Sequence, residues 1–146
     1  QAQLQQGDIK IAYERLIKYT MKLRSHFSYA TNYQVGNVSP GYLDFTYFSF
    51  FDHFLRTRRL RFGIVLNHQE MRFELWLMGQ NAEVQSRYWH LLKDAGWNCH
   101  RTKMPQYAVL EAVLVHRPDF NDLDQLTSTI SHNTLELVNK ITPYLA

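Results

Sequence analysis

The stretch that most constrains the fold is residues 60–77, which read LRFGIVLNHQEMRFELWL. Apolar side chains occupy every second position in both halves, a pattern that is typical of half-buried strands. These apolar residues are Leu60, Phe62, Ile64 and Leu66 in the first half, and Met71, Phe73, Leu75 and Leu77 in the second. The polar residues between the halves are few enough for a tight turn. The stretch therefore predicts an antiparallel hairpin with one strongly apolar face.

The other face of this hairpin is predicted to be polar. Which of its side chains lie opposite one another depends on the strand register, and the alternating pattern and the turn constrain that register. We expect four opposed pairs across the turn: Leu66 with Met71, Val65 with Arg72, Gly63 with Glu74, and Arg61 with Trp76. In this register Gly63 leaves open space over Glu74.

The rest of the chain predicts three helices and two further strands. A helix is expected at about residues 8–30 with Asp8 as its N-cap, a second at about 82–95 between Asn81 and Gly96, and a closing helix of about 20 residues from Leu123. Strands are expected at 42–51 and 107–116. The predicted order is α-β-β-β-α-β-α, an α+β fold with a mainly antiparallel sheet of about four strands packed with three helices.

Composition favours an ordinary globular protein. Hydrophobic residues make up 45% and charged residues 20% of the 146 residues, which excludes intrinsic disorder, and the length predicts one domain over 1–146. Residues 1–7 are expected to be a disordered tail or a remnant of cloning. The single cysteine, Cys99, excludes an intrachain disulfide and a cysteine-cluster zinc site, and it favours a reducing compartment. We see no signal peptide and no membrane-spanning stretch, so we expect a cytoplasmic protein that does not bind membranes.

Candidate binding residues come from the polar side of the predicted sheet. Asp44 and Glu111 each lie inside an apolar strand, where an unpaired carboxylate is costly. If they share the face of the hairpin's polar residues, one sheet face presents three carboxylates, two guanidiniums and an indole. The candidate ligand-binding residues are Tyr42, Asp44, Arg61, Arg72, Glu74, Trp76 and Glu111. Tyr47 is excluded, because strand parity directs it away from Asp44. The alternative interpretation is a set of solvated residues or structural arginine–carboxylate pairs.

An enzymatic alternative follows from the order of elements, which is also that of the PD-(D/E)xK nuclease superfamily. Here Glu74-Leu75-Trp76 has tryptophan where the catalytic lysine belongs, residues 61–67 hold no carboxylate, and Asp44 lies one strand too early. A metal-dependent hydrolase or a degenerate nuclease-like enzyme therefore stays the second hypothesis, with no catalytic residue, metal ligand or cofactor assigned. The run Arg56-Thr-Arg-Arg-Leu-Arg61 could hold a phosphate or an acidic partner, but a solvated turn entering a strand is the favoured interpretation.

The sequence also resembles a known family. The residues that carry this resemblance are the segments 41–48, Asn67-His68, 72–77, and Asn81 with Gln85, Tyr88 and Trp89. They are similar to a family of uncharacterised bacterial proteins, stand-alone chains classed as a domain of unknown function. The resemblance implies a bacterial cytoplasmic setting and assigns no chemistry. We therefore expect a non-catalytic domain that binds a small anionic or planar ligand or a protein partner. The net charge of only +3 argues against nucleic acid as a partner. Whether the protein forms a homodimer is left open.

Overall fold

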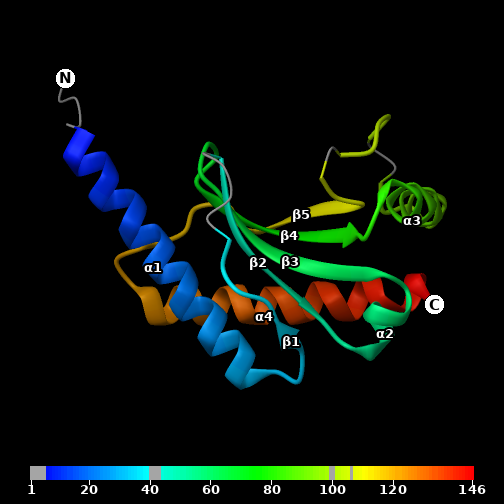
Figure 1. Ribbon diagram of the computed structural model, residues 1–146, viewed down its shortest axis with the longest axis horizontal. Coiled ribbons are helices and arrows are strands. Elements are labelled where there is room, and N and C mark those ends of the chain that lie inside the picture. Colours follow the sequence, from blue (N-terminus) through cyan, green and yellow to red (C-terminus); the bar gives the residue numbers. More distant parts are fainter. Residues whose placement is uncertain (1–5, 40–43, 99–100, 106) are drawn as a thin grey trace.

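The protein forms one five-stranded antiparallel sheet in the order β1-β2-β3-β4-β5 (Figure 1). The computed structural model describes residues 6–39, 44–98, 101–105 and 107–146. The strands are β1 (Gln34–Val35), β2 (Phe45–Phe51), β3 (Leu60–Asn67), β4 (Arg72–Gly79) and β5 (Leu110–Val115). The helices are α1 (Gln6–Ala30), α2 (His53–Thr57), α3 (Ala82–Asp94), α4 (Leu123–Ile141) and the short 3₁₀ helix η1 (Thr142–Leu145).

This architecture confirms the α+β prediction, with one strand and two short helices, α2 and η1, more than expected. The additional strand, β1, has only two residues, which pair with the end of β2. Of the additional helices, α2 begins after Asp52, whose side chain accepts a hydrogen bond from the Leu55 N–H. Elements this short carry almost no periodic signal. The sequence pattern therefore missed β1, and at residues 52–59 it indicated only a basic connection with room for a helical turn.

Several predicted boundaries were wrong. Helix α1 begins at Gln6, so Asp8 lies inside the helix and is not its N-cap, and residues 6 and 7 are helical rather than part of a tail. Strand β2 begins at Phe45 and β5 at Leu110, in both cases three residues later than expected. The first part of the predicted strand 42–51 falls partly on residues 40–43, which lie outside the described residues.

The predicted hairpin register was wrong by two residues. Leu66 pairs with Phe73 instead of Met71, because Met71 belongs to the turn and has a left-handed backbone with φ of 48°. The side chain of Asn67 stabilises this turn, since its Oδ1 accepts hydrogen bonds from the N–H groups of Gln69 and Glu70. A shift of two residues leaves every side chain on its predicted face but changes its neighbours.

The changed neighbours matter for the polar face. The observed opposed pairs are Asn67 with Arg72, Val65 with Glu74, Gly63 with Trp76, and Arg61 with Met78. On β5, Glu111 lies opposite Trp76. Glycine 63 therefore faces an indole ring rather than the Glu74 carboxylate.

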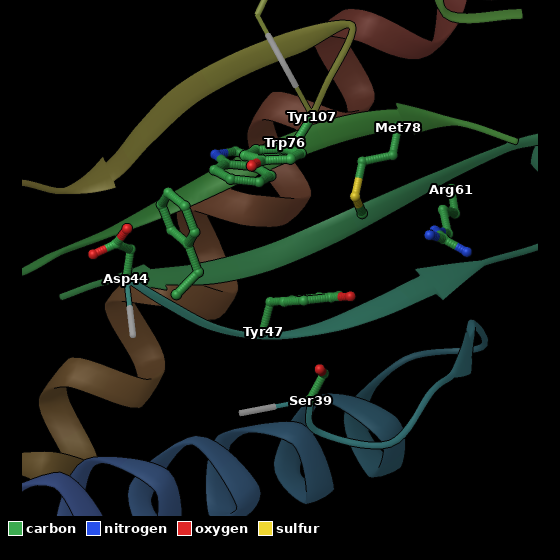
Figure 2. A pocket seen from close by; sticks show the side chains of 8 residues that line it. Ser39, Asp44, Tyr47, Arg61, Trp76, Met78 and Tyr107 are labelled. Atoms are coloured by element: carbon green, nitrogen blue, oxygen red, sulfur yellow. The ribbon is translucent and has the colours of Figure 1, made fainter. Parts of the chain in front are cut away.

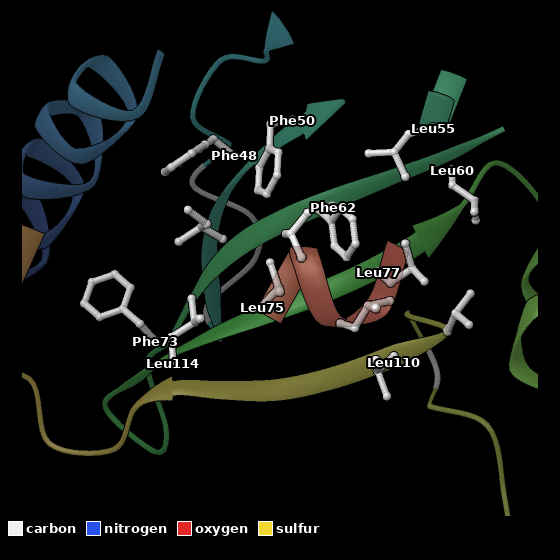
Figure 3. Packing of buried hydrophobic residues seen from close by; sticks show 14 of the residues in the cluster. Phe48, Phe50, Leu55, Leu60, Phe62, Phe73, Leu75, Leu77, Leu110 and Leu114 are labelled. Carbon is white, nitrogen blue, oxygen red and sulfur yellow. The ribbon is translucent and has the colours of Figure 1, made fainter. Parts of the chain in front are cut away.

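Helices α1 and α4 cover one face of the sheet, here called the covered face (Figures 1 and 3). Aromatic and aliphatic side chains of the strands meet those of the two helices there, and most of them are completely buried. The central contributors from the strands are Phe48, Phe50, Phe62, Ile64, Phe73, Leu75 and Leu110. From the helices they are Leu23, Phe27, Ile130 and Val138. Burial of this apolar surface supplies the main driving force for the fold.

The opposite face, here called the open face, carries a second and smaller apolar cluster. Its buried members are Val65, Trp76, Met78 and Ala108, with Phe45 and Tyr47 packed against them. None of these residues belongs to a helix, so in the described part of the chain this cluster has no helical cover. The open face is therefore where a cavity can form between sheet and solvent. No helix in the described ranges is long and apolar enough to cross a membrane.

Candidate functional site

A groove of about 410 Å³ lies on the open face across β2, β3 and β4 (Figure 2). We call it the sheet groove. The described residues that line it are Ser39, Asp44, Phe45, Tyr47, Arg61, Trp76, Met78 and Tyr107. Most of this lining is aromatic or apolar, with a few charged and hydroxyl groups among it, which is the usual make-up of a small-molecule site.

Three aromatic rings form one wall of the sheet groove. Phe45 meets the Trp76 ring edge-on at 5.0 Å between centroids, and Tyr107 lies nearly parallel to Trp76 at 6.5 Å with 10° between planes. Trp76 is only 5% exposed, whereas Tyr107 is 55% exposed. A fixed indole beneath an accessible phenol offers a ring surface on which a flat molecule can stack.

The floor of the sheet groove depends on Gly63. The side chain of Met78 lies across β3 at this position, and a Cβ atom on Gly63 would come within 2.6 Å of the Met78 Cε. The glycine therefore makes room for the methionine. The space that we expected over Glu74 is instead opposite Trp76 and is occupied by Met78.

Opposite charges mark the two ends of the sheet groove, with Arg61 at one end and Asp44 at the other (Figure 2). Both side chains are exposed. Within the described part of the chain, the Arg61 guanidinium has no hydrogen bond or ion pair to another residue, so it is available to an anion.

The turn of β3 and β4 holds Asp44 in place. The N–H of His68 donates a 2.8 Å hydrogen bond to the Asp44 carbonyl oxygen. The His68 ring stacks on Tyr13 of α1 and lies 2.7 Å from the Thr46 hydroxyl through Nε2. Burial lowers the pKa of His68, against a smaller opposing effect of the Asp44 charge. A neutral ring at this position can remain packed between α1 and β2.

Glu74 lies beneath the aromatic wall and has a structural environment. It is 3% exposed, and its carboxylate accepts hydrogen bonds from Arg72 Nε at 2.7 Å, Asn67 Nδ2 at 3.0 Å and Trp76 Nε1 at 2.8 Å. The hydrogen bond to Glu74 is the main reason why the pKa of Arg72 is raised. Three donors satisfy this carboxylate, and the bond to the indole fixes the orientation of Trp76.

Glu111 lies next to this network but outside the groove lining. It pairs with Arg101 at 3.1 Å between Oε1 and Nη2. Burial raises the pKa of Glu111, and the charge of Arg101 opposes that effect only in part. The second carboxylate of the open face is therefore also engaged by an arginine of the chain itself.

The structure thus divides the candidate residues into three groups. Asp44, Arg61 and Trp76 line the sheet groove, whereas Arg72, Glu74 and Glu111 form the supporting ion pairs beside it. The remaining candidate, Tyr42, lies outside the described residues, as do Cys99 and His100. The lining residues that sequence reasoning missed are Ser39, Phe45, Tyr47, Met78 and Tyr107.

The exclusion of Tyr47 was wrong for a specific reason. Parity was counted from Asp44, but Asp44 precedes β2 and does not follow its alternation. Counting within the strand places Phe45 and Tyr47 on the open face, opposite Asn67 and Val65. Parity counted from within residues 45–51, where Phe45 and Tyr47 share one face and Thr46 and Phe48 the other, was the signal that could have identified them.

The arrangement of carboxylates gives little support to a metal centre. Across the ranges that the structure describes, no group of three or more His, Cys, Asp or Glu side chains is placed to hold a metal ion. Both Glu74 oxygens accept hydrogen bonds from neighbouring donors, and Glu111 pairs with Arg101. Trp76 also points its indole N–H at Glu74, where the nuclease pattern requires a lysine beside the metal.

Comparison with known proteins identifies a family for the chain. Neither the curated proteins nor the solved structures contain a match to the chain. The family model for a domain of unknown function (DUF7000) matches residues 1–145. This match covers nearly the whole chain, and the protein therefore belongs to the DUF7000 family.

Proposed function

We propose that the protein is a non-catalytic binding domain whose sheet groove takes a small, flat, anionic molecule. The observation that carries this proposal is the aromatic wall of Phe45, Trp76 and Tyr107 in one groove with the Arg61 guanidinium, which pairs with no described residue. Stacking on the rings gives affinity for a planar group, and the arginine selects a negative charge. The groove volume of about 410 Å³ suits a ligand of drug-like size.

The groove is preformed, and this supports ligand binding. Trp76 is oriented by its hydrogen bond to Glu74, and Met78 is seated over Gly63, so the wall and floor need no rearrangement. Preorganisation of this kind reduces the entropy lost on binding. Two of the three carboxylates that an enzyme could use as acid, base or metal ligand, Glu74 and Glu111, are instead engaged by Arg72, Trp76 and Arg101. We place this binding function in the cytoplasm of a bacterium.

A fluorescent probe of matching chemistry tests the proposal. The dye 8-anilinonaphthalene-1-sulfonate carries a flat naphthalene ring and a negatively charged sulfonate, and its fluorescence rises when it leaves water. We expect saturable binding to the folded protein. Tyr107→Ala and Arg61→Gln should each weaken it about three- to tenfold, the loss of one aromatic contact or one exposed charge-assisted hydrogen bond.

The matched controls are Tyr144→Ala and Arg56→Gln, because both side chains are exposed and neither lines the sheet groove. Both controls should bind the dye like the wild type. Affinities of Tyr107→Ala and Arg61→Gln equal to those of the controls would contradict the proposal. Circular dichroism of each variant verifies that a change in binding does not come from unfolding.

A further inference from the structure

The arginine run of residues 56–61 is divided between two separate hollows. Arg61 lines the sheet groove, but Arg58 and Arg59 line a separate hollow of about 200 Å³ together with Arg87 of α3. We call this hollow the arginine cleft. It also contains Thr57, Asn81 and Glu83, and so lies between the turn after α2 and the first turns of α3.

Arg58 is the rigid member of the arginine cleft. Its Nε donates to the Leu145 carbonyl at 3.1 Å and its Nη1 to the Phe54 carbonyl at 3.0 Å. The guanidinium carbon lies 3.6 Å from the centre of the Phe54 ring. A guanidinium held in this way loses little further entropy when its remaining N–H groups bind an anion.

Arg59 and Arg87 supply positive charge that the described chain does not neutralise. Neither guanidinium has a hydrogen bond or an ion pair to another described residue. Glu83, the acidic side chain among the lining residues, is exposed at the rim. Three guanidiniums against one carboxylate leave a net positive cleft, to which the start of α3 adds its own partial positive charge.

The backbone brings these groups together. Arg59 has a left-handed φ of 59°, which is uncommon for a residue with a side chain. Its carbonyl oxygen accepts a 3.0 Å hydrogen bond from the N–H of Gln80, directly before the helix cap Asn81. The turn that carries Arg58 and Arg59 is thereby fixed to the segment from which α3, with Arg87, begins.

A second hollow adjoins the arginine cleft and shares Thr57, Arg58, Arg87 and Tyr88 with it. Its volume is about 410 Å³, and it reaches Leu91, a leucine that is 41% exposed. An anion in the cleft could therefore be one end of a larger molecule whose remainder lies against Tyr88 and Leu91.

We propose that the arginine cleft binds the phosphate group of a small phosphorylated molecule. Guanidinium groups match the oxygens of phosphate with paired, charge-assisted hydrogen bonds. Three arginines from two segments, around a hollow of about 200 Å³, suit a phosphate or diphosphate group rather than a long polyanion. This site is separate from the sheet groove and does not depend on the function proposed for it.

Calorimetric titration with inorganic pyrophosphate, at constant ionic strength set with sodium chloride, tests the site. We expect one saturable binding event. Arg59→Asn, which also suits the left-handed backbone, and Arg87→Gln should each weaken it at least about tenfold, as expected for one charge-assisted hydrogen bond. Both arginines are exposed, so unfolding should not confuse the result, and thermal melting without ligand verifies this.

The matched control is Arg56→Gln, on the same run but outside the cleft, which should leave the affinity unchanged. Tyr107→Ala in the sheet groove should also leave pyrophosphate binding unchanged, so this site and the sheet groove can fail independently. Absence of saturable binding by pyrophosphate, or equal weakening by Arg56→Gln, would overturn the proposal. Tighter binding of a single-stranded oligonucleotide that Arg56→Gln also weakens would instead show a nucleic-acid surface.

Discussion

The two faces of the sheet bury apolar side chains in different ways. On the covered face, Phe62 and its neighbours are enclosed by two helices and are fully buried. On the open face, Trp76 and Met78 reach 5% and 6% exposure without a helix, because Phe45, Tyr47 and the segment before β5 lie around them. The comparison shows that burial on the open face is local and leaves room for a groove, whereas burial on the covered face is the core itself.

Buried polar groups are a second difference between the two faces. The open face holds a buried carboxylate, Glu74, with a full set of donors from Asn67, Arg72 and Trp76. Such a network contributes little net stability compared with apolar packing, but it fixes the geometry of its members. We interpret the Glu74 network as the support that positions the Trp76 ring in the groove wall.

The largest difference between the faces should appear on truncation of an aromatic residue. Phe62→Ala on the covered face removes a ring with 0% exposure and should lower the free energy of unfolding by about 3–5 kcal/mol. Tyr107→Ala on the open face removes a ring that is 55% exposed and should cost far less. Urea denaturation of both variants measures this. Equal losses would mean that the open face is part of the core.

Removal of the buried carboxylate should have the next largest effect. Glu74→Ala leaves the indole N–H of Trp76 and the amide of Asn67 without their acceptor, and should lower the free energy of unfolding by about 1–3 kcal/mol. It should also weaken dye binding, because the Trp76 ring loses its fixed orientation. The control is Glu136→Ala on α4, an exposed carboxylate paired with Lys140, which should cause no measurable change in stability. A Glu74→Ala variant that is as stable as the wild type and binds the dye normally would contradict the supporting role of Glu74.

A methyl group in the groove floor should affect binding more than stability. Gly63→Ala places a Cβ within 2.6 Å of the flexible end of Met78, so we expect a loss of only about 1 kcal/mol as the methionine moves. The displaced Met78 side chain should occupy part of the groove and lower the affinity for the dye. In Gly79→Ala, the new Cβ would meet the backbone nitrogen of Gln85 at 2.9 Å, which cannot move as easily. The control should therefore lose more stability than Gly63→Ala, and the reverse order would contradict the packing described for Met78.

The smallest effect concerns the pH dependence of stability. Burial raises the pKa of Glu111 above its ordinary value of 4.5, so the folded protein holds this proton more tightly than the unfolded chain. The contribution of Glu111 to stability is then fully present below that pH and is lost as the pH rises through the raised pKa. In urea titrations, the free energy of unfolding of the wild type minus that of Glu111→Gln should fall as the pH rises above about 4.5. A difference that rises with pH would show that Arg101 outweighs burial.

Much of the fold was accessible from the sequence because long periodic segments carry a strong signal. Helices α3 and α4 and both strands of the hairpin were found with their correct faces. The strand register of the hairpin was not predicted correctly. It depends on a turn that needs the left-handed backbone of Met71 and the Asn67 side chain, and the alternation pattern specifies neither. The two-residue strand β1 gave no pattern to detect.

The candidate site was predictable only where strand alternation determined it. Arg61 and Trp76 were placed on the open face by parity and line the sheet groove. Met78 and Tyr107 were missed because their roles depend on long-range packing. Met78 crosses to Gly63, and Tyr107, which we expected to begin the strand 107–116, lies before β5 and parallel to the Trp76 ring. Glu74 was proposed as a ligand residue, and its three internal donors became visible only in three dimensions.

The most direct test of the central claim, that the open face binds a planar anion, is a two-dimensional ¹H–¹⁵N NMR titration with 8-anilinonaphthalene-1-sulfonate. The three tryptophan indole signals distinguish the regions, because Trp76 lies in the sheet groove whereas Trp89 and Trp97 lie elsewhere. We predict that the Trp76 indole and the amides of Phe45 and Tyr47 shift together with one dissociation constant. Shifts at Trp89 and Trp97 with an unmoved Trp76 signal would contradict the account.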